Sequence, residues 1–193
     1  IAEYKLVDKP AKDDPMAVHH YRLDNGLSVF LTANPEEPRF YAEIVVRAGS
    51  KHDPAAATGM AHYLEHMLFK GTDELGTLDA AAEKVHLDSI SALYEQHWHT
   101  VDPQQRKDIY ALIQAQSQLA AQYSVPGELD KVYSAMGASG LNAHTGSEET
   151  VYKVNLPSNR LEQWARVEAE RFADPVFRLF QTELETVYEE KNR

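Results

Sequence analysis

Two histidines and a glutamate occur together in the five-residue sequence HYLEH, which begins at His62. On a helix, His62 and His66 lie one turn apart on the same face, so their imidazoles can bind one metal ion from a rigid element. Glu65 borders this face. A carboxylate beside a two-histidine zinc site can act as a general base toward water, whose pKa zinc lowers toward neutrality. The alternative interpretation is a helix with two incidental histidines and a solvated glutamate.

A catalytic zinc ion usually has three protein ligands and one open position, so this site needs a third ligand. Candidates lie near the end of the chain, where the sequence ELETVYEE begins at Glu183. Glu183 and Glu190 share one face of the expected helix, and Val187 lies between them on that side. One glutamate can bind the metal while the other hydrogen-bonds a ligand or the water. The alternative is that so acidic a run is a solvated surface.

The segment before the two histidines is expected to be a strand followed by a loop. Residues 40–48 are rich in β-branched and aromatic side chains, which predicts a buried strand. Residues 49–54 are expected to form the loop. Thr58 can cap a helix that runs to about Phe69, and Gly71 then stops it.

The rest of the chain alternates between groups of strands and groups of helices. We expect a polar lead-in over 1–15, a hairpin over 20–32 with its turn at 24–26, helices over about 77–99, 103–123 and 128–136, strands over 141–145 and 150–156, a helix over 157–172 and a last helix from about 181. This order predicts an α+β fold with a mixed, mostly antiparallel sheet covered by helices, and the metal-site helix follows the third strand. Because the chain ends inside a charged helix, we expect residues 1–193 to be a single, C-terminally truncated domain.

Composition narrows the possible partners and ligands. The 193 residues are 43% hydrophobic and 25% charged, which suits one sizeable core. The net charge of −11 argues against nucleic acid as a partner, because phosphate binding needs a basic face. The chain has no cysteine, so any metal must be held by histidine, aspartate or glutamate. No apolar run approaches the roughly 20 residues of a membrane span.

Several motifs in order resemble the N-terminal catalytic domain of the pitrilysin/insulinase family, whose inverted H-x-x-E-H signature defines the inverzincins. The resemblance covers nearly the whole chain. The motifs that carry it are DNGL from Asp24, AGS from Ala48, HYLEHMLFKGT from His62, LNAHT from Leu141, ERFADP from Glu170 and VYEE from Val187.

The resemblance implies a role for each residue of the candidate site. It implies one zinc ion bound by His62, His66 and Glu190. It makes Glu65 the general base and Glu183 a supporting carboxylate that does not bind the metal itself.

For the substrate, the resemblance implies that the strand at Asn142 and Ala143 is a sheet edge that receives an extended peptide. Recognition would then depend mainly on the peptide main chain. Asn142 could hydrogen-bond a substrate carbonyl. Alternatively, Asn142 satisfies local backbone groups near a turn.

The chain departs from the family in the spacing of its ligands. Glu190 follows His66 by 124 residues, whereas the family's usual spacing is shorter by about 45 residues, enough for two helices of ~20 residues each. The excess falls at about 86–128 and predicts a helical hairpin inserted within the domain. The hairpin is either an appended pair of helices with an apolar seam, or an element that gates the substrate chamber or binds a partner half.

These features together predict a zinc-dependent endopeptidase acting on peptides or unfolded polypeptides. Family members enclose a chamber between two similar halves, so this chain is expected to need a homologous second half or a partner subunit for full activity. The alternative is a non-catalytic scaffold or a peptide-binding subunit of the same fold. From the family's range and the cysteine-free sequence we expect a bacterial periplasmic or other extracytoplasmic location, and a processed or cut N-terminus at Ile1.

Overall fold

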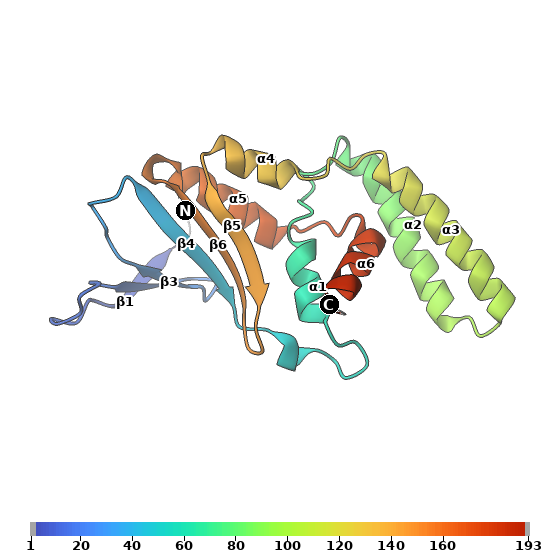
Figure 1. The fold of residues 1–193 in the computed structure, drawn as a ribbon, viewed down its shortest axis with the longest axis horizontal. Coiled ribbons are helices and arrows are strands. Elements are labelled where there is room, and N and C mark those ends of the chain that lie inside the picture. Colours follow the sequence, from blue (N-terminus) through green and yellow to red (C-terminus); the bar gives the residue numbers. More distant parts are fainter. Residues whose placement is uncertain (1–2, 192–193) are drawn as a thin grey trace. The chain divides into compact units, whose positions relative to one another are not determined.

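The computed structural model describes residues 3–191 and divides into two compact units, one up to Phe40 and one from Tyr41. The N-terminal unit is a three-stranded sheet (Figure 1). Its strands are β1 (Tyr4–Asp8), β2 (His19–Leu23) and β3 (Ser28–Leu31), in that order and with antiparallel pairing. The hairpin predicted over 20–32 is therefore present as β2 and β3.

Strand β1 lies inside the segment that was predicted to be an irregular lead-in. Its five residues are all exposed, so no alternation between buried and exposed positions marks it in the sequence. It is formed by its pairing with β2 and by an edge-to-face contact between Tyr4 and Tyr21, whose ring centroids lie 5.8 Å apart. Pairing with a neighbour, rather than a local pattern, makes this segment a strand.

Over its described residues, the second unit combines a three-stranded sheet with six α-helices. Its strands are β4 (Arg39–Val46), β5 (Ser139–Thr145) and β6 (Thr150–Pro157), and its α-helices are α1 (Met60–Met67), α2 (Ala80–His99), α3 (Pro103–Ala121), α4 (Glu128–Ala135), α5 (Leu161–Ala173) and α6 (Phe180–Lys191). The strand order is β4-β6-β5, and β5 pairs antiparallel with β6. The central strand β6 is the most buried, and Val151, Val154 and Leu156 contribute to the core. The predicted α+β class with antiparallel strand pairing is confirmed.

Strand β4 is less buried than predicted. It is an outer strand of its sheet, and its two faces differ. Phe40, Ala42 and Ile44 are half-buried, whereas Tyr41 and Val45 are exposed. A run of β-branched and aromatic residues therefore identified a strand correctly but did not reveal that only one face is covered.

Helix α1 is capped differently from the prediction. Its N-cap is Gly59, in a left-handed conformation at φ 96° that glycine adopts readily. The carboxylate of Asp53 accepts hydrogen bonds from the backbone N–H groups of Gly59, at 2.7 Å, and Ala61, at 2.8 Å. The expectation that Thr58 caps this helix is wrong, because a side chain from the preceding loop satisfies these donors instead.

Helices α2 and α3 form the hairpin that the sequence predicts (Figure 1). Asp79 caps α2 by accepting from Ala82 N–H at 3.0 Å, and Asp102 caps α3 by accepting from Gln105 N–H at 2.8 Å. Pro103 at the start of α3 has no backbone N–H and therefore needs no hydrogen-bond acceptor there. An apolar seam joins the two helices, and its buried members are Ile90, Ile109, Ile113 and Ala120.

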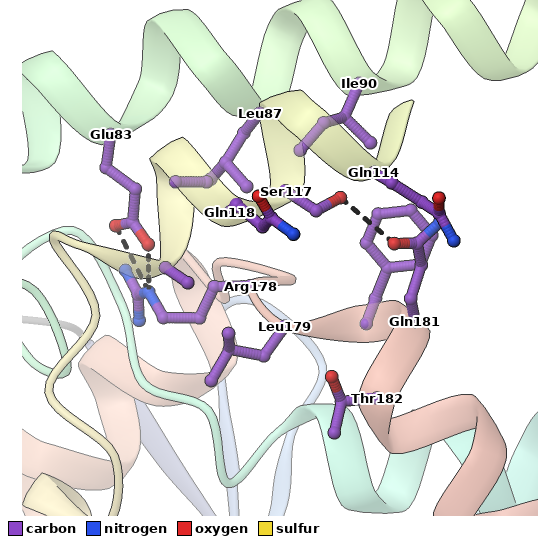
Figure 2. A pocket seen from close by; sticks show the side chains of 13 residues that line it. Glu83, Leu87, Ile90, Gln114, Ser117, Gln118, Arg178, Leu179, Gln181 and Thr182 are labelled. Carbon is purple, nitrogen blue, oxygen red and sulfur yellow. Dashed lines mark hydrogen bonds and ion pairs between the residues drawn. The ribbon is translucent and has the colours of Figure 1, made fainter. Parts of the chain in front are cut away.

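A buried arginine fastens the hairpin to the loop that follows α1. Arg178 is 2% exposed, and its Nε donates to Glu83 of α2 at 3.0 Å (Figure 2). Its other nitrogens donate to backbone carbonyls of the loop, at 2.7 Å to Lys70, 2.6 Å to Thr72 and 3.0 Å to Leu75. The guanidinium therefore replaces water as the donor for three carbonyls and is neutralised by one carboxylate.

Two glycines let the loop approach this arginine so closely. Gly71 and Gly76 have φ of 98° and 89°, in the left-handed region. A Cβ on either residue would lie within 2.9 Å of Arg178 Nη1, closer than side-chain atoms normally approach. Glycine is therefore needed at both positions for conformation and for space.

Within residues 3–191, no helix combines the length and the apolar character that crossing a membrane requires.

The Arg178–Glu83 pair should be essential to stability. We expect Glu83→Ala to lower the free energy of unfolding by roughly 3–5 kcal/mol, because it leaves a buried charge without its counter-ion. Urea unfolding measures this change. The matched control is Lys84→Ala, which removes the exposed Lys84–Asp88 pair and should cost no more than about 1 kcal/mol. Equal losses of unfolding free energy in the two variants would show that the Arg178–Glu83 pair is not essential to stability.

Candidate active site

Helix α1 presents its two histidines side by side. The Nε2 atoms of His62 and His66 lie 3.1 Å apart, and the rings meet edge to face. Both side chains are partly exposed, at 35% and 22%. Two imidazole nitrogens that converge on one point are arranged to share a ligand rather than to bind each other.

Glu190 at the end of α6 completes a group of three. Its Oε2 lies 3.7 Å from His62 Nε2 and 3.5 Å from His66 Nε2. Among the described residues, His62, His66 and Glu190 form a group that could hold a metal ion, because their donor atoms all lie within 4.8 Å of one another. Points equidistant from the three atoms lie about 2.0 Å or more from each, with the minimum in the plane of the atoms, so zinc–nitrogen and zinc–oxygen bonds of roughly 2.0–2.2 Å can be formed.

Glu183 contacts the other nitrogen of His66. Its Oε1 lies 2.8 Å from His66 Nδ1, and its Oε2 accepts a hydrogen bond from Lys70 Nζ. Because an ionised carboxylate can only accept, this contact favours the proton on Nδ1, which in the neutral imidazole leaves the lone pair on Nε2 for a metal. Burial favours the neutral acid, but hydrogen bonds from Lys70 and His66 outweigh this effect. The pKa of Glu183 therefore lies below its usual value.

Glu65 is buried beside the histidines and is held by the sheet. It is 6% exposed, and its Oε2 accepts a hydrogen bond of 2.5 Å from the hydroxyl of Thr145 at the end of β5. Thr150, the residue opposite Thr145 on β6, donates to the backbone carbonyl of Ala48 at 2.9 Å. The carboxylate is thus oriented by the strand next to α1, and its second oxygen is available for another partner.

A pocket of about 380 Å³ opens beside these groups. It is lined by His62, Glu65, His66, Phe69, Asp130, Leu141, Asn142, Ala143 and Glu190. Asn142 and Ala143 lie on β5, which ends the sheet order among the described residues, and Ala143 pairs with Tyr152 of β6. The structure therefore brings the substrate-strand candidates to the same pocket as the metal-ligand candidates.

Two contributors to the site were not predicted from the sequence. Thr145 belongs to the predicted strand, but only its position opposite α1 identifies it as the partner of Glu65. Asp130 is an exposed acid in the first turn of α4 and carries no motif that marks it. Both depend on packing between elements that are distant in sequence.

The lowered pKa of Glu183 predicts a pH-dependent contribution to stability in the metal-free protein. Above its unfolded value of about 4.5 the carboxylate is ionised in both states, so its bonds to Lys70 and His66 contribute fully. As pH falls through the lower native pKa, this contribution is lost. Glu183→Gln should therefore be less stable than the wild type at pH 6, with a smaller difference at pH 3, in urea unfolding across this range. A stability difference between the wild type and Glu183→Gln that stays constant with pH would contradict a lowered pKa for Glu183.

Comparison with known proteins relates this site to peptidases. The sequence model of the insulinase family, peptidase family M16, matches residues 28–95, which include the two histidines and Glu65. Protease 3 of Escherichia coli K12 is 42% identical over 73 residues, covering 37% of this chain and 8% of that protein. The probable zinc protease PqqL of Haemophilus influenzae is 41% identical over 56 residues, covering 28% of this chain and 6% of that protein.

A solved structure shows the same fold over a longer range. The crystal structure of pitrilysin superimposes with a TM-score of 0.57 and 21% sequence identity, covering 91% of this chain and 14% of that one. The chain therefore spans less than a sixth of the length of pitrilysin and under a tenth of Protease 3.

Proposed function

Because the chain is an insulinase/pitrilysin-like domain of peptidase family M16, we propose that it carries the active site of a zinc-dependent endopeptidase. The substrates would be peptides or unfolded polypeptides. The observation that carries this proposal is the convergence of His62, His66 and Glu190 beside the buried carboxylate of Glu65. The name of the PqqL relative supports zinc as the metal.

The donor set fits one zinc ion. Two neutral imidazoles and one carboxylate are the ligands that catalytic zinc sites use when a fourth position stays open for water or substrate. When bound there, zinc would polarise the scissile carbonyl and make water more acidic. Glu183 would keep His66 in the required tautomer and orientation, which makes it a positioning residue.

Glu65 would move the proton during peptide-bond hydrolysis. It accepts a proton from the attacking water and later delivers it to the leaving amide nitrogen, so that each product carries its ordinary number of hydrogens. Thr145 occupies Oε2, which leaves Oε1 to exchange the proton. The burial of Glu65 strengthens the electrostatic interactions of its carboxylate.

The outer edge of β5 would bind the substrate as an added strand. An extended peptide can pair its main chain with Asn142 and Ala143 in the pocket, so sequence preference would come mainly from side-chain subsites. The Asn142 side chain is exposed and can donate to a substrate carbonyl near the scissile bond. We place the enzyme in the bacterial periplasm or another extracytoplasmic compartment, in line with its bacterial relatives.

Glu65→Gln should separate metal binding from catalysis. We expect hydrolysis of an unstructured fluorogenic peptide by the complete enzyme to fall on the order of 10³-fold, because glutamine cannot accept the proton. Zinc content, measured by metal analysis, should stay at one ion per chain. Glu185→Gln on the exposed side of α6 is the control and should leave both values unchanged. Hydrolysis that survives Glu65→Gln would show that Glu65 is not the base.

A second half or partner subunit is expected to complete the substrate chamber. We propose that residues 1–193 alone bind one zinc ion yet cleave peptides slowly, because the groups that hold the far side of the substrate would be missing. Adding the homologous half in trans should raise kcat/KM by at least about tenfold. Efficient turnover by residues 1–193 alone would contradict this requirement.

A further inference from the structure

The first turn of α6 is held by the hairpin α2–α3 through one glutamine. The side-chain amide of Gln181 donates to the hydroxyl of Tyr94 on α2 and accepts from the hydroxyl of Ser117 on α3 at 3.0 Å. Figure 2 shows the Ser117 contact, with Gln181 reaching from the start of α6 toward α3. One amide thus uses its donor and its acceptor on two different helices, which fixes its position relative to both.

The neighbouring residue adds apolar packing at the same place. The ring of Phe180 lies 5.3 Å from that of Tyr94 and packs against the buried seam of the hairpin. Its backbone carbonyl accepts a hydrogen bond of 2.7 Å from the hydroxyl of Tyr63 on the metal-site helix. The start of α6 is therefore in contact with the hairpin and with α1 at once.

The chain enters α6 through a constrained turn. Leu179 has φ of 56°, in the left-handed region that L side chains rarely adopt. Arg178 on one side is fixed by its buried bonds to Glu83 and the loop after α1, and Phe180 on the other side is fixed by its packing. Such a conformation persists only where the surroundings hold it, so the start of α6 has little freedom to rotate.

The opposite face of α6 carries the residues of the metal site. Gln181 and Glu190 are nine residues apart, which is two and a half turns, so they project from opposite sides of the helix. Glu190 lies about 13 Å along the axis from Gln181, so a tilt of about 5° at the first turn displaces it by about 1 Å. Metal–ligand distances tolerate only about 0.2 Å. Small movements at the first turn would therefore disturb the third ligand.

We infer that Tyr94, Ser117 and Gln181 form a brace through which the hairpin α2–α3 positions Glu190 for metal binding. The inserted hairpin is then a positioning element of the metal site that never touches the metal or the substrate. This inference rests on the proposed metal site and adds to it a role for residues that lie outside the pocket.

Gln181→Leu tests the brace, because it keeps a side chain of similar size and removes both hydrogen bonds. We expect zinc affinity, measured by competition with a chromophoric chelator, to fall about tenfold. The matched control is Gln116→Leu, which breaks the 2.8 Å contact between Gln116 and His86 within the hairpin but does not touch α6. The control should bind zinc as the wild type does. Urea unfolding of both metal-free variants shows whether the hairpin is equally intact.

A double-mutant cycle identifies Glu190 as the residue through which the brace acts. In a Glu190→Gln background, Gln181→Leu should change zinc affinity by less than twofold, since the positioned ligand is already missing. The absorption spectrum of bound Co²⁺ should change in Gln181→Leu and not in Gln116→Leu, because it reports ligand geometry.

Three results would overturn the brace. They are unchanged zinc affinity in Gln181→Leu, an equal loss in Gln116→Leu, and a tenfold loss that persists without Glu190. A wild-type chain that binds no zinc would instead defeat the proposed function, so the two failures are distinguishable.

Discussion

The packing of α6 against α1 is the constraint on which the candidate site depends. Glu190 follows His62 by 128 residues and His66 by 124, yet the donor atoms of the three side chains lie 3.1 to 3.7 Å from one another. Among the side chains described over 184–190, only Val187 is buried, and Glu190 is 45% exposed. The position of Glu190 is therefore set less by its own surroundings than by what holds the rest of its helix.

Buried polar groups, rather than apolar packing alone, provide that hold. Arg178 joins the loop after α1 to α2, and Glu183 joins α6 to α1 through His66 and Lys70. Apolar contacts are roughly indifferent to small rotations, whereas hydrogen bonds weaken steeply when their geometry changes. Directional hydrogen bonds can therefore position donor atoms to within tenths of an ångström, as metal binding requires.

The sequence was informative where a local pattern determines structure. The spacing of His62, His66, Glu183 and Glu190 predicted shared helical faces, and the structure brings these residues together on two helices. The helices expected over about 77–99 and 103–123 are present as α2 and α3, and Asp79 and Asp102 cap them. These features follow from helix periodicity and from backbone donors that need partners, both of which act over a few residues.

The sequence was uninformative where the local structure depends on residues that are distant in the chain. Strand β1 is formed by pairing with β2, the cap of α1 comes from Asp53, and one face of β4 is left exposed. The contact of Thr145 with Glu65 joins residues 80 positions apart. In each case the local residues allow several partners, and only the packed arrangement selects one.

The long spacing between His66 and Glu190 is compatible with the convergence of the candidate ligands because the hairpin α2–α3 closes on itself. At its base, Leu78 N–H donates to the carbonyl of Tyr123 at 2.8 Å, and Val125 N–H donates to Gly76 at 2.9 Å. The chain therefore leaves and re-enters the domain at nearly the same point.

Relative to the shorter spacing that the family resemblance implies, a flexible connection longer by about 45 residues out of 124 costs only about 0.4 kcal/mol in closure entropy. A self-contained hairpin with its own apolar seam repays this cost easily. The hairpin can therefore be accommodated without disturbing the candidate metal site, and its contacts with the first turn of α6 make it part of the framework around that site.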